Sequence, residues 1–411
     1  LKKNVEIYLL AQKGKEDSTI KEMLNKYKNL SDNVKVVYED PVVNPSFSKK
    51  YTNDTVNDNS IIVISGSKSR YIDYNDIYVP DYSSYNTTGQ ASTNFDGESS
   101  VTSAIDYVTS ENLPKAYLLS GHGEQNLSSA VSSSVEKQNI ETPKLNLLTA
   151  DIPQDASCII IYSPASDISE AEKGKLLDYL KKGGNLLLVT DYSDKEIKNL
   201  SSLMEYYGAK VEKGLVVEGD MSRCIKGYNY YLLPKIGGHS ITLPISSNNY
   251  YILMPLAQGI KELNNKRSSL NITELLFTSE KAFSKPDGYN MTTAEKEPGD
   301  INGPFALGVA ITEPVKGSQE ETNIVWYTTS KMLDDKVNSM VSGANLDLFV
   351  NSLGWMCEHK NSISIHPKTL EAKVLTLPTV DAARWSLLFV GVIPLIFLAA
   401  GIVVWVRRKR R

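Results

Sequence analysis

The last part of the chain constrains its fold more than any other segment. Residues 385–406 read WSLLFVGVIPLIFLAAGIVVWV and carry no charged side chain, and five basic residues, 407–411, follow directly. At about 1.5 Å rise per residue, about 20 apolar residues cross a hydrocarbon core of about 30 Å. Trp385 and Trp405 stand at the two ends, where indole rings favour the water–lipid interface. The sequence therefore predicts a transmembrane helix at 385–406.

The basic tail predicts the orientation of this helix. Clustered Lys and Arg stay on the cytoplasmic side of a membrane, so residues 407–411 are expected inside the cell and the bulk of the chain outside. A juxtamembrane linker is expected at residues 366–384. Because the chain opens on Leu1 and shows no signal peptide, we also expect an additional N-terminal anchor or signal that precedes this sequence.

Two other interpretations of the apolar segment are open. One is a buried core helix, although core helices of this length normally carry a polar face. The other is a cleaved sorting signal, although no LPxTG-like motif precedes residue 385. Pro394 does not argue against a membrane helix, because transmembrane helices tolerate proline.

Composition excludes several classes of function. The formal net charge is −4 over 411 residues, and no basic stripe occurs outside the tail, so nucleic acid is not an expected partner. The three cysteines are widely spaced and predict no disulfide framework; Cys158 and Cys357 are predicted to be buried. Zinc needs clustered ligands, and the four histidines are scattered, so we expect no metal site.

Residues 1–112 predict a first α/β domain. The expected elements are strands at 4–10, 33–40, 60–66 and 69–79 and helices at 18–30 and 95–111. This order is that of a thioredoxin-like βαβ–ββα domain. Thioredoxin chemistry needs a cysteine of low pKa at the start of the first helix. Because this domain contains no cysteine, we predict a scaffold or docking surface without redox activity.

Residues 113–365 predict a second α/β domain, and a polar loop is expected before it at 80–94. Continuous apolar strands alternate with helices, which favours a parallel sheet covered on both faces. The expected strands are 115–124, which runs into a glycine turn, 145–149, 158–164 and 185–191, and the expected helices are 128–138, 169–182 and 195–207. The remainder, residues 211–360, is expected to complete this domain and to contain insertions. Its expected strands are 250–254, 274–278, 306–312 and 323–328, and its expected helix is 345–358.

Two segments of the second domain qualify as ligand sites, because ligands of open α/β sheets sit beyond the carboxyl ends of the strands. One is the turn after its first strand, with Gly121, His122, Gly123 and Glu124; glycines let backbone N–H groups approach a ligand, and His and Glu exchange protons. The other is Asp191, after its fourth strand. The alternative, which we favour, is that the glycines only form the turn and His122 holds it by hydrogen bonding.

Motifs for catalysis or nucleotide binding are missing from the sequence. It contains no Gly-x-Ser-x-Gly nucleophile elbow, no Gly-x-x-x-x-Gly-Lys-Ser/Thr phosphate loop and no Gly-x-Gly-x-x-Gly fingerprint. We therefore predict that the chain is not an enzyme, has no catalytic residues and binds no cofactor.

Five motifs occur in order along most of the chain: YLLSGHGE at 117–124, a run from IIIYSPASD to NLLLVTD at 159–191, HSIT at 239–242, LLFTSEKAF at 275–283 and NLDLFVNSLGWM at 345–356. Together they resemble the extracytoplasmic region of GldG-like, gliding-motility type auxiliary components of ABC transport systems. The resemblance implies a membrane-anchored partner of an ABC-2-type permease and its ATPase. It also implies a class I glutamine amidotransferase-like fold for the second domain.

One position departs from the amidotransferase pattern. Those enzymes are expected to carry cysteine after the fourth strand, where this chain has Thr190 and Asp191. This departure argues against amidotransferase activity.

Two functions follow from the sequence. The first is a non-enzymatic extracytoplasmic auxiliary subunit of an ABC-2-type system that contacts the permease or its cargo. The second is an extracytoplasmic module that binds or hydrolyses glycans, with His122, Glu124 and Asp191 lining its cleft. Retaining glycosidases need two carboxyl groups about 5–5.5 Å apart, which a sequence does not show.

Overall fold

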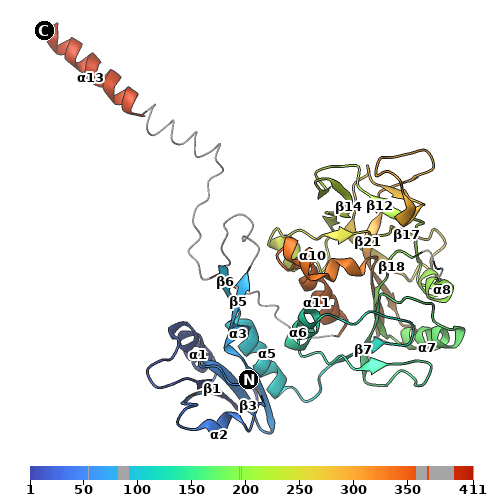
Figure 1. The fold of residues 1–411 in the computed structure, drawn as a ribbon, viewed down its shortest axis with the longest axis horizontal. Helices are drawn as coiled ribbons and strands as arrows, with labels where there is room; N and C mark the ends of the chain where they lie inside the picture. Colours follow the sequence, from blue (N-terminus) through green and yellow to red (C-terminus); the bar gives the residue numbers. More distant parts are fainter. Residues whose placement is uncertain are drawn as a thin grey trace. The chain divides into compact units, whose positions relative to one another are not determined.

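The computed structural model describes residues 1–53, 55–81, 92–193, 195, 197–357, 368–369 and 393–410 (Figure 1). Residues Leu1–Lys368 form one compact unit and Thr369–Arg411 form a second. The predicted domain boundaries within the first unit, at 112 and 365, stay predictions.

The first part of the chain forms a four-stranded sheet that packs against helices. Its elements are β1 (Val5–Leu10), α1 (Ser18–Leu30), β2 (Val34–Glu39), α2 (Pro45–Ser48), β3 (Ser60–Ser65), β4 (Lys68–Ile72), α3 (Tyr74–Ile77), β5 (Tyr78–Asp81), β6 (Ser92–Phe95) and α5 (Gly97–Thr109). The strand order is β2-β1-β3-β4, with β1 parallel to β2 and antiparallel to β3, and β3 antiparallel to β4. These directions are those of the predicted βαβ–ββα order, while the thioredoxin-like assignment stays a prediction.

Helix α1 begins and ends at the predicted residues. A capping side chain before its first turn and apolar residues at helical spacing both favour this helix. The Asp17 carboxylate accepts hydrogen bonds from the backbone N–H groups of Thr19 and Ile20, at 2.9 and 3.0 Å, and so caps the first turn. Ile20 and Leu24 recur at helical spacing and are fully buried against the sheet.

Two predictions in this part are wrong. The single strand expected at 69–79 is β4 followed by the short helix α3, because the Asp73 side chain accepts the backbone N–H of Asn75 at 2.9 Å and starts a helical turn. The loop expected at 80–94 contains strand residues at both ends, since β5 and β6 pair antiparallel. Residues 82–91 lie outside the described part of the chain.

The second part of the chain is larger. Its first elements are β7 (Lys115–Leu119), α6 (Ser129–Lys137), β8 (Lys144–Leu145), β9 (Ala156–Tyr162), α7 (Glu170–Leu180), β10 (Asn185–Val189), α8 (Lys198–Tyr206), β11 (Ala209–Val211), β12 (Leu215–Val217), β13 (Cys224–Ile225), β14 (Tyr228–Leu232) and β15 (Lys235–Ile236). There follow α9 (Leu243–Ser247), β16 (Met254–Pro255), β17 (Ile260–Glu262), β18 (Asn271–Phe277), β19 (Phe283–Lys285), η1 (Gly288–Asn290), β20 (Ile301–Asn302), β21 (Ala306–Pro314), β22 (Glu321–Tyr327), η2 (Ser330–Leu333), α10 (Asp335–Met340) and α11 (Ala344–Met356).

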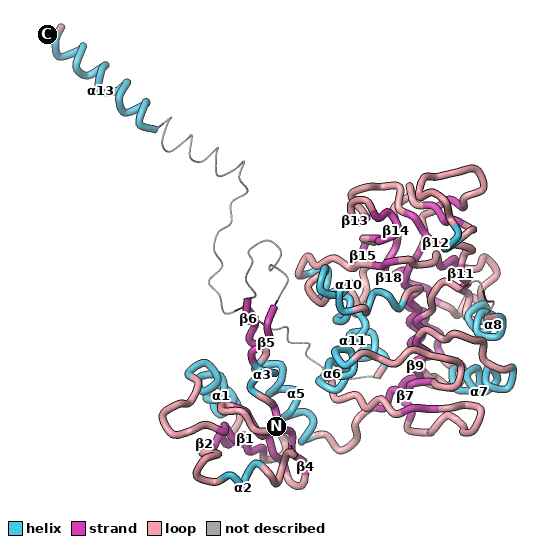
Figure 2. The backbone as a smooth tube through the Cα atoms, in the orientation of Figure 1, coloured by secondary structure: helices cyan, strands magenta, loops and turns pink. Residues whose placement is uncertain are grey.

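Most of these strands join one large sheet of order β11-β17-β21-β22-β10-β9-β7-β8 (Figure 2). The strands β8, β7, β9, β10 and β22 are parallel to one another, which confirms the predicted parallel sheet. Strands β21, β17 and β11 continue it in antiparallel pairs, and β18 pairs antiparallel with β21. The sheet is therefore mixed, and the predicted strands at 274–278, 306–312 and 323–328 belong to it.

Both faces of the sheet are covered, as the continuous apolar strands predict. Along β9, Cys158 and Ile160 join the core beneath α6 and α11, whereas Ile159 and Ile161 join the core beneath α7 and α8. Figure 1 shows the two helix pairs on opposite sides of the strands. Cys357 at the end of α11 is also buried, so the predicted burial of both cysteines is confirmed.

Two expected strands of the second part are mostly absent. Only Lys144 and Leu145 pair as β8, because the Asn146 side chain accepts the backbone N–H of Leu148 at 2.9 Å and turns the chain. The strand expected at 250–254 is a loop, exposed at residues 250–251 and buried from Ile252 onward, that enters β16 only at Met254.

The C-terminal unit contains helix α13 (Ile393–Lys409), and strand β23 (Lys368–Thr369) stands at the boundary between the units. Within the described residues, no helix combines the length and the apolar character needed to cross a membrane. Helix α13 overlaps the predicted span and has 17 residues, while 385–392 lie outside the described part. The predicted transmembrane helix is therefore not confirmed, and the expected linker at 366–384 falls almost wholly outside the described residues.

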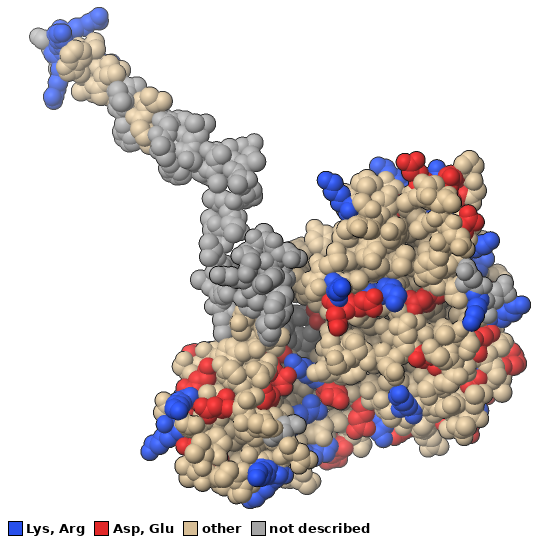
Figure 3. All heavy atoms as spheres, viewed as in Figure 1, with Lys and Arg blue, Asp and Glu red and all other residues tan. Residues whose placement is uncertain are grey.

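Charged side chains of both signs occur together on one face of the molecule. Lys and Arg side chains intermingle with Asp and Glu on the face that Figure 3 shows, in keeping with the net charge of −4.

Candidate functional site

The turn at residues 121–124 follows β7 and requires its glycines. Gly121 has a φ of +126° and Gly123 a φ of +75°, a region that side chains with a Cβ rarely adopt. A Cβ added to Gly123 would also lie 2.9 Å from the Cβ of Ala165. The turn therefore has a fixed shape that brings His122 back against the sheet.

His122 is held between two carboxylates. Its backbone N–H donates to Oε2 of Glu124 at 2.8 Å, and its Nδ1 lies 3.0 Å from Oε1 of the same residue. Its Nε2 lies 3.1 Å from Oε2 of Glu172, at the start of α7. The side chains of all three residues are almost completely buried. The imidazole is therefore a link between two carboxylates and does not face solvent.

The electrostatics of this cluster favour a charged pair. Burial by itself would lower the pKa of His122, but the hydrogen bonds to Glu124 and Glu172 outweigh it and raise that pKa above its usual value. Burial would likewise raise the pKa of Glu172, but hydrogen bonds from Ser169 and His122 lower it. Both shifts stabilise an imidazolium beside a carboxylate.

Glu172 and the His122 backbone tie the turn to the next segment of the chain. Ser169 and Glu172 form a capping box at the start of α7, in which the Ser169 N–H and hydroxyl both donate to Oε2 of Glu172 at 2.8 Å. The carbonyl oxygen of His122 accepts the backbone N–H groups of Ala165 and Ser166 at 3.0 and 2.9 Å. These contacts support the structural interpretation of the turn that the sequence favoured.

Asp191 has a comparable role after β10. Its carboxylate accepts the backbone N–H and the hydroxyl of Ser330, both at 2.7 Å, and a short hydrogen bond from the hydroxyl of Ser163. Ser163 directly follows β9 with a φ of +51°, and its hydroxyl accepts a hydrogen bond from the side-chain amide of Gln125 at 3.0 Å. Asp191 thus joins the carboxyl ends of three strands, β9, β10 and β22.

The chain reverses its direction across the sheet between β7 and β9, since β8 lies on one side of β7 and β9 on the other. Ligands of open α/β sheets bind at such a switch point. Here side chains and backbone occupy most of it, because Gln125 also donates its backbone N–H to the carbonyl of Tyr162 at 3.1 Å. The space that remains beside Gly121, Gly123 and Glu124 is about 160 Å³.

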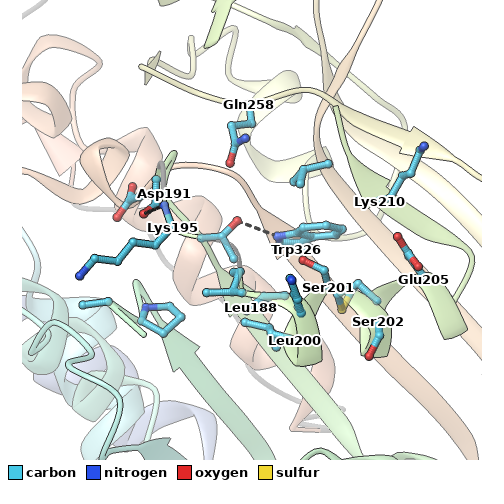
Figure 4. Close-up of a pocket in the computed structure, with 18 residues that line it drawn as sticks. Leu188, Asp191, Lys195, Leu200, Ser201, Ser202, Glu205, Lys210, Gln258 and Trp326 are labelled. Carbon is cyan, nitrogen blue, oxygen red and sulfur yellow. Dashed lines mark hydrogen bonds between the residues drawn. The ribbon is translucent and has the colours of Figure 1, made fainter. Parts of the chain in front are cut away.

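A larger cavity of about 500 Å³ lies beyond β10 and beside α8. Its apolar wall includes the Trp326 indole, whose Nε1–H donates to the hydroxyl of Thr190 at 3.0 Å. Figure 4 shows the Trp326 ring between Gln258 on one side and Leu200 and Ser201 on the other. Cavities of about 300–1,000 Å³ with an apolar wall and a few polar groups are typical of small-molecule sites.

The cavity provides no strong anion site at the start of α8. The Asp167 carboxylate already accepts the backbone N–H groups of Asn199 and Leu200 there, at 2.7 and 3.1 Å. Figure 4 shows Lys195 and Lys210 extending away from the Trp326 ring. The lining combines the hydroxyl groups of Thr190, Ser201 and Ser202 and the Gln258 amide with charged residues of both signs, Asp191, Lys195, Lys198, Glu205 and Lys210. The cavity is therefore polar and of mixed charge around its aromatic wall.

The structure separates the predicted site residues into two clusters. Gly121, His122, Gly123 and Glu124 form the turn, in which the glycines are exposed and the His122 side chain is buried, whereas Asp191 lies at the edge of the larger cavity. Sequence reasoning missed Glu172, although its place in the Ser-x-x-Glu capping pattern was visible. It also missed Trp326 and Ser330, for which no local signal exists. Among the described residues, no three His, Cys, Asp or Glu side chains gather as metal ligands.

Comparison with known proteins identifies one family. A family model described as ABC-type uncharacterized transport system matches residues 113–352, more than half of the chain. No curated protein matches the chain.

Solved structures show only distant likenesses. The mmIFT52 N-terminal domain is 15% identical over 61% of this chain and 99% of its own, with a TM-score of 0.42. A protein described as ThuA-like from Bacteroides uniformis is 13% identical over 60% and 93%, with a TM-score of 0.34. PurLQS from Thermotoga maritima is 11% identical over 60% and 100%, with a TM-score of 0.28. At these TM-scores the solved structures do not indicate a function for this chain, and the amidotransferase-like assignment stays a prediction.

Proposed function

The chain belongs to the family of ABC-type uncharacterized transport systems, and we propose that it is a non-enzymatic, extracytoplasmic accessory subunit of an ABC-2-type transporter. The family assignment supports an auxiliary role in ABC transport. Two further parts of the proposal rest on the sequence and its resemblance to GldG-like components. They are that residues 385–406 anchor the subunit in the membrane and that the subunit contacts the permease or its cargo.

The proposal that the protein is not an enzyme is supported by the hydrogen bonds of the candidate acid–base residues. A general acid or base must come within about 2.6–3.2 Å of the proton that it transfers. His122 uses both ring nitrogens on Glu124 and Glu172, and Asp191 already accepts hydrogen bonds from Ser163 and Ser330. These groups are engaged in holding loops together, which is the arrangement of a scaffold.

Co-purification tests the proposed partners. The full chain, tagged after Arg411, is extracted from its native membrane in mild detergent and purified. We expect an ABC permease and its ATPase in stoichiometric amounts. A preparation that contains neither, from cells in which both are expressed, would contradict the accessory role.

Protease accessibility tests the proposed location. Protease added outside intact cells should digest residues 1–384 and spare a tag placed after Arg411. Digestion of the tag with the rest of the chain intact would reverse the orientation. Resistance of both parts would place the whole chain inside.

Glycan binding is a second candidate, and the cavity beside Trp326 favours it. An aromatic wall with hydroxyl groups, an amide and carboxylates at its rim can hold the ring and hydroxyl groups of a sugar. Calorimetry with solubilised cell-wall glycans tests this candidate, with Ser201→Trp as a variant that fills the cavity. Equal heats for both proteins would exclude this cavity as the binding site.

A further inference from the structure

One segment of the second part lacks charge to an unusual degree. Residues 236–260 contain no Asp, Glu, Lys or Arg, whereas 22% of all residues in the chain are charged. The one side chain in this segment that can become charged near neutral pH, His239, is half-buried, and burial lowers its pKa below the usual value. At neutral pH the whole segment is therefore uncharged.

The middle of this segment is also exposed. We define the neutral loop as Leu243 together with residues 246–251, which read SSNNYY and are all exposed. Leu243 is 61% exposed, Tyr250 38% and Tyr251 68%. Strand β16 follows the loop directly and pairs with β14. Figure 3 shows few charged side chains in the region of β14. The neutral loop is thus a patch of aromatic, aliphatic and hydroxyl groups on an otherwise mixed-charge surface.

The base of the neutral loop is rigid. After the loop, the Asn345 side chain holds the backbone of Leu253, accepting its N–H at 3.0 Å and donating to its carbonyl at 2.8 Å. Before it, the Asn351 side chain donates to the carbonyl of Ile241 at 3.2 Å. Both asparagines belong to α11, and Ile245 and Ile252 at the two ends of the loop are buried. The exposed tip is therefore presented in a fixed place.

The composition of the tip is that of a protein-binding loop. Tyrosine supplies a large, rigid, amphipathic contact, and Ser and Asn supply adaptable hydrogen bonds. The centres of protein–protein interfaces are depleted of charged residues and enriched in aromatic ones. A loop without Lys or Arg has no attraction for anionic lipid or nucleic acid. Leu243, Tyr250 and Tyr251 together present exposed apolar area, so the patch suits an uncharged protein surface.

We propose that the neutral loop is a docking site for a partner protein of the transport system, and that it contacts an uncharged extracytoplasmic surface of the permease. This inference rests on the proposed accessory function. A neutral patch and a neutral partner surface can associate without desolvating unpaired charges, whereas a charged partner surface would lose hydration without gaining an ion pair.

Photo-crosslinking tests the contact in the intact complex. The full chain, with p-benzoylphenylalanine replacing Tyr251, is expressed with the permease and ATPase and irradiated in membranes. We expect a crosslink to the permease, identified by peptide mass spectrometry. The matched control places the same group at Tyr38, a 41% exposed tyrosine of β2, and should give little crosslinking to the permease. Crosslinks from position 251 only to a second copy of this chain, to lipid or to glycan would overturn the inference.

Substitution separates this inference from the proposed function. The double variant Leu243→Asn and Tyr251→Asn should keep the wild-type melting temperature. It should retain less permease than the wild type by about tenfold or more, since a few central residues carry most of the binding free energy of an interface. Tyr38→Asn should retain the wild-type amount. Equal retention by the double variant and the wild type would refute the docking site and leave the accessory role standing. Failure of the wild type to retain permease would refute the accessory role itself.

Discussion

The Nε2 atom of His122 lies 3.1 Å from Oε2 of Glu172, and this contact joins the turn after β7 to the first turn of α7. The two residues are 50 positions apart, and neither faces solvent. The contact explains why His122 and Glu124, which resemble an acid–base pair in sequence, form a buried link with Glu172 instead.

Removing Glu172 should therefore be costly. Glu172→Ala leaves the raised-pKa His122 facing an empty, buried position and removes one half of the capping box. We expect a loss of about 3 kcal/mol or more in the free energy of unfolding, as for a broken buried ion pair. Urea denaturation measures this, and Glu170→Ala in the same helical turn, where the side chain is exposed, is the control and should change stability by no more than about 1 kcal/mol.

The His122 cluster predicts a pH dependence of stability. The pKa of His122 is raised in the folded state, so its contribution to stability is complete below the unfolded pKa of about 6.5 and is lost as pH rises through the folded pKa. We expect the stability difference between wild type and His122→Asn to shrink as pH rises above about 6.5. Urea denaturation of both proteins across this range isolates the contribution, and a constant or growing difference would contradict it.

Gly123 should be less replaceable than another glycine of similar backbone conformation. Gly123→Ala combines a φ of +75° with a Cβ 2.9 Å from Ala165, whereas Gly14→Ala places its Cβ in open space at a φ of +84°. Left-handed backbone strain alone costs about 1–2 kcal/mol. We expect Gly14→Ala to show that cost and Gly123→Ala to exceed it in thermal or urea unfolding. Equal losses would show that the contact with Ala165 relaxes freely.

The three thiols should be unreactive in the folded protein. Burial raises the pKa of Cys158 and Cys224 and raises that of Cys357 to about 12, so the thiolate that reacts is scarce near pH 8. We expect Ellman's reagent to label no thiol in the native protein and all three in urea. Rapid labelling of one thiol in the native protein would show that its surroundings open.

Local sequence was sufficient for elements whose signals agree with one another. Asp17 followed by apolar residues at helical spacing determined α1, and the continuous apolar runs at Cys158 and Asn185 predicted buried parallel strands. Local reasoning failed where one polar side chain redirected the backbone. Asp73 starts α3 inside an expected strand, and Asn146 ends β8 after two residues.

The candidate site divides in the same way. The sequence determined that Gly121, His122, Gly123 and Glu124 form a turn at the end of a strand, because glycine and strand signals act between near neighbours. Only the tertiary structure decided what that turn faces. The contacts from His122 to Glu172 and from Asp191 to Ser330 span 50 and 139 positions, and they depend on which strands pair in the sheet. The cavity beside Trp326 likewise exists because β10, β22 and α8 meet, a packing result that no local pattern encodes.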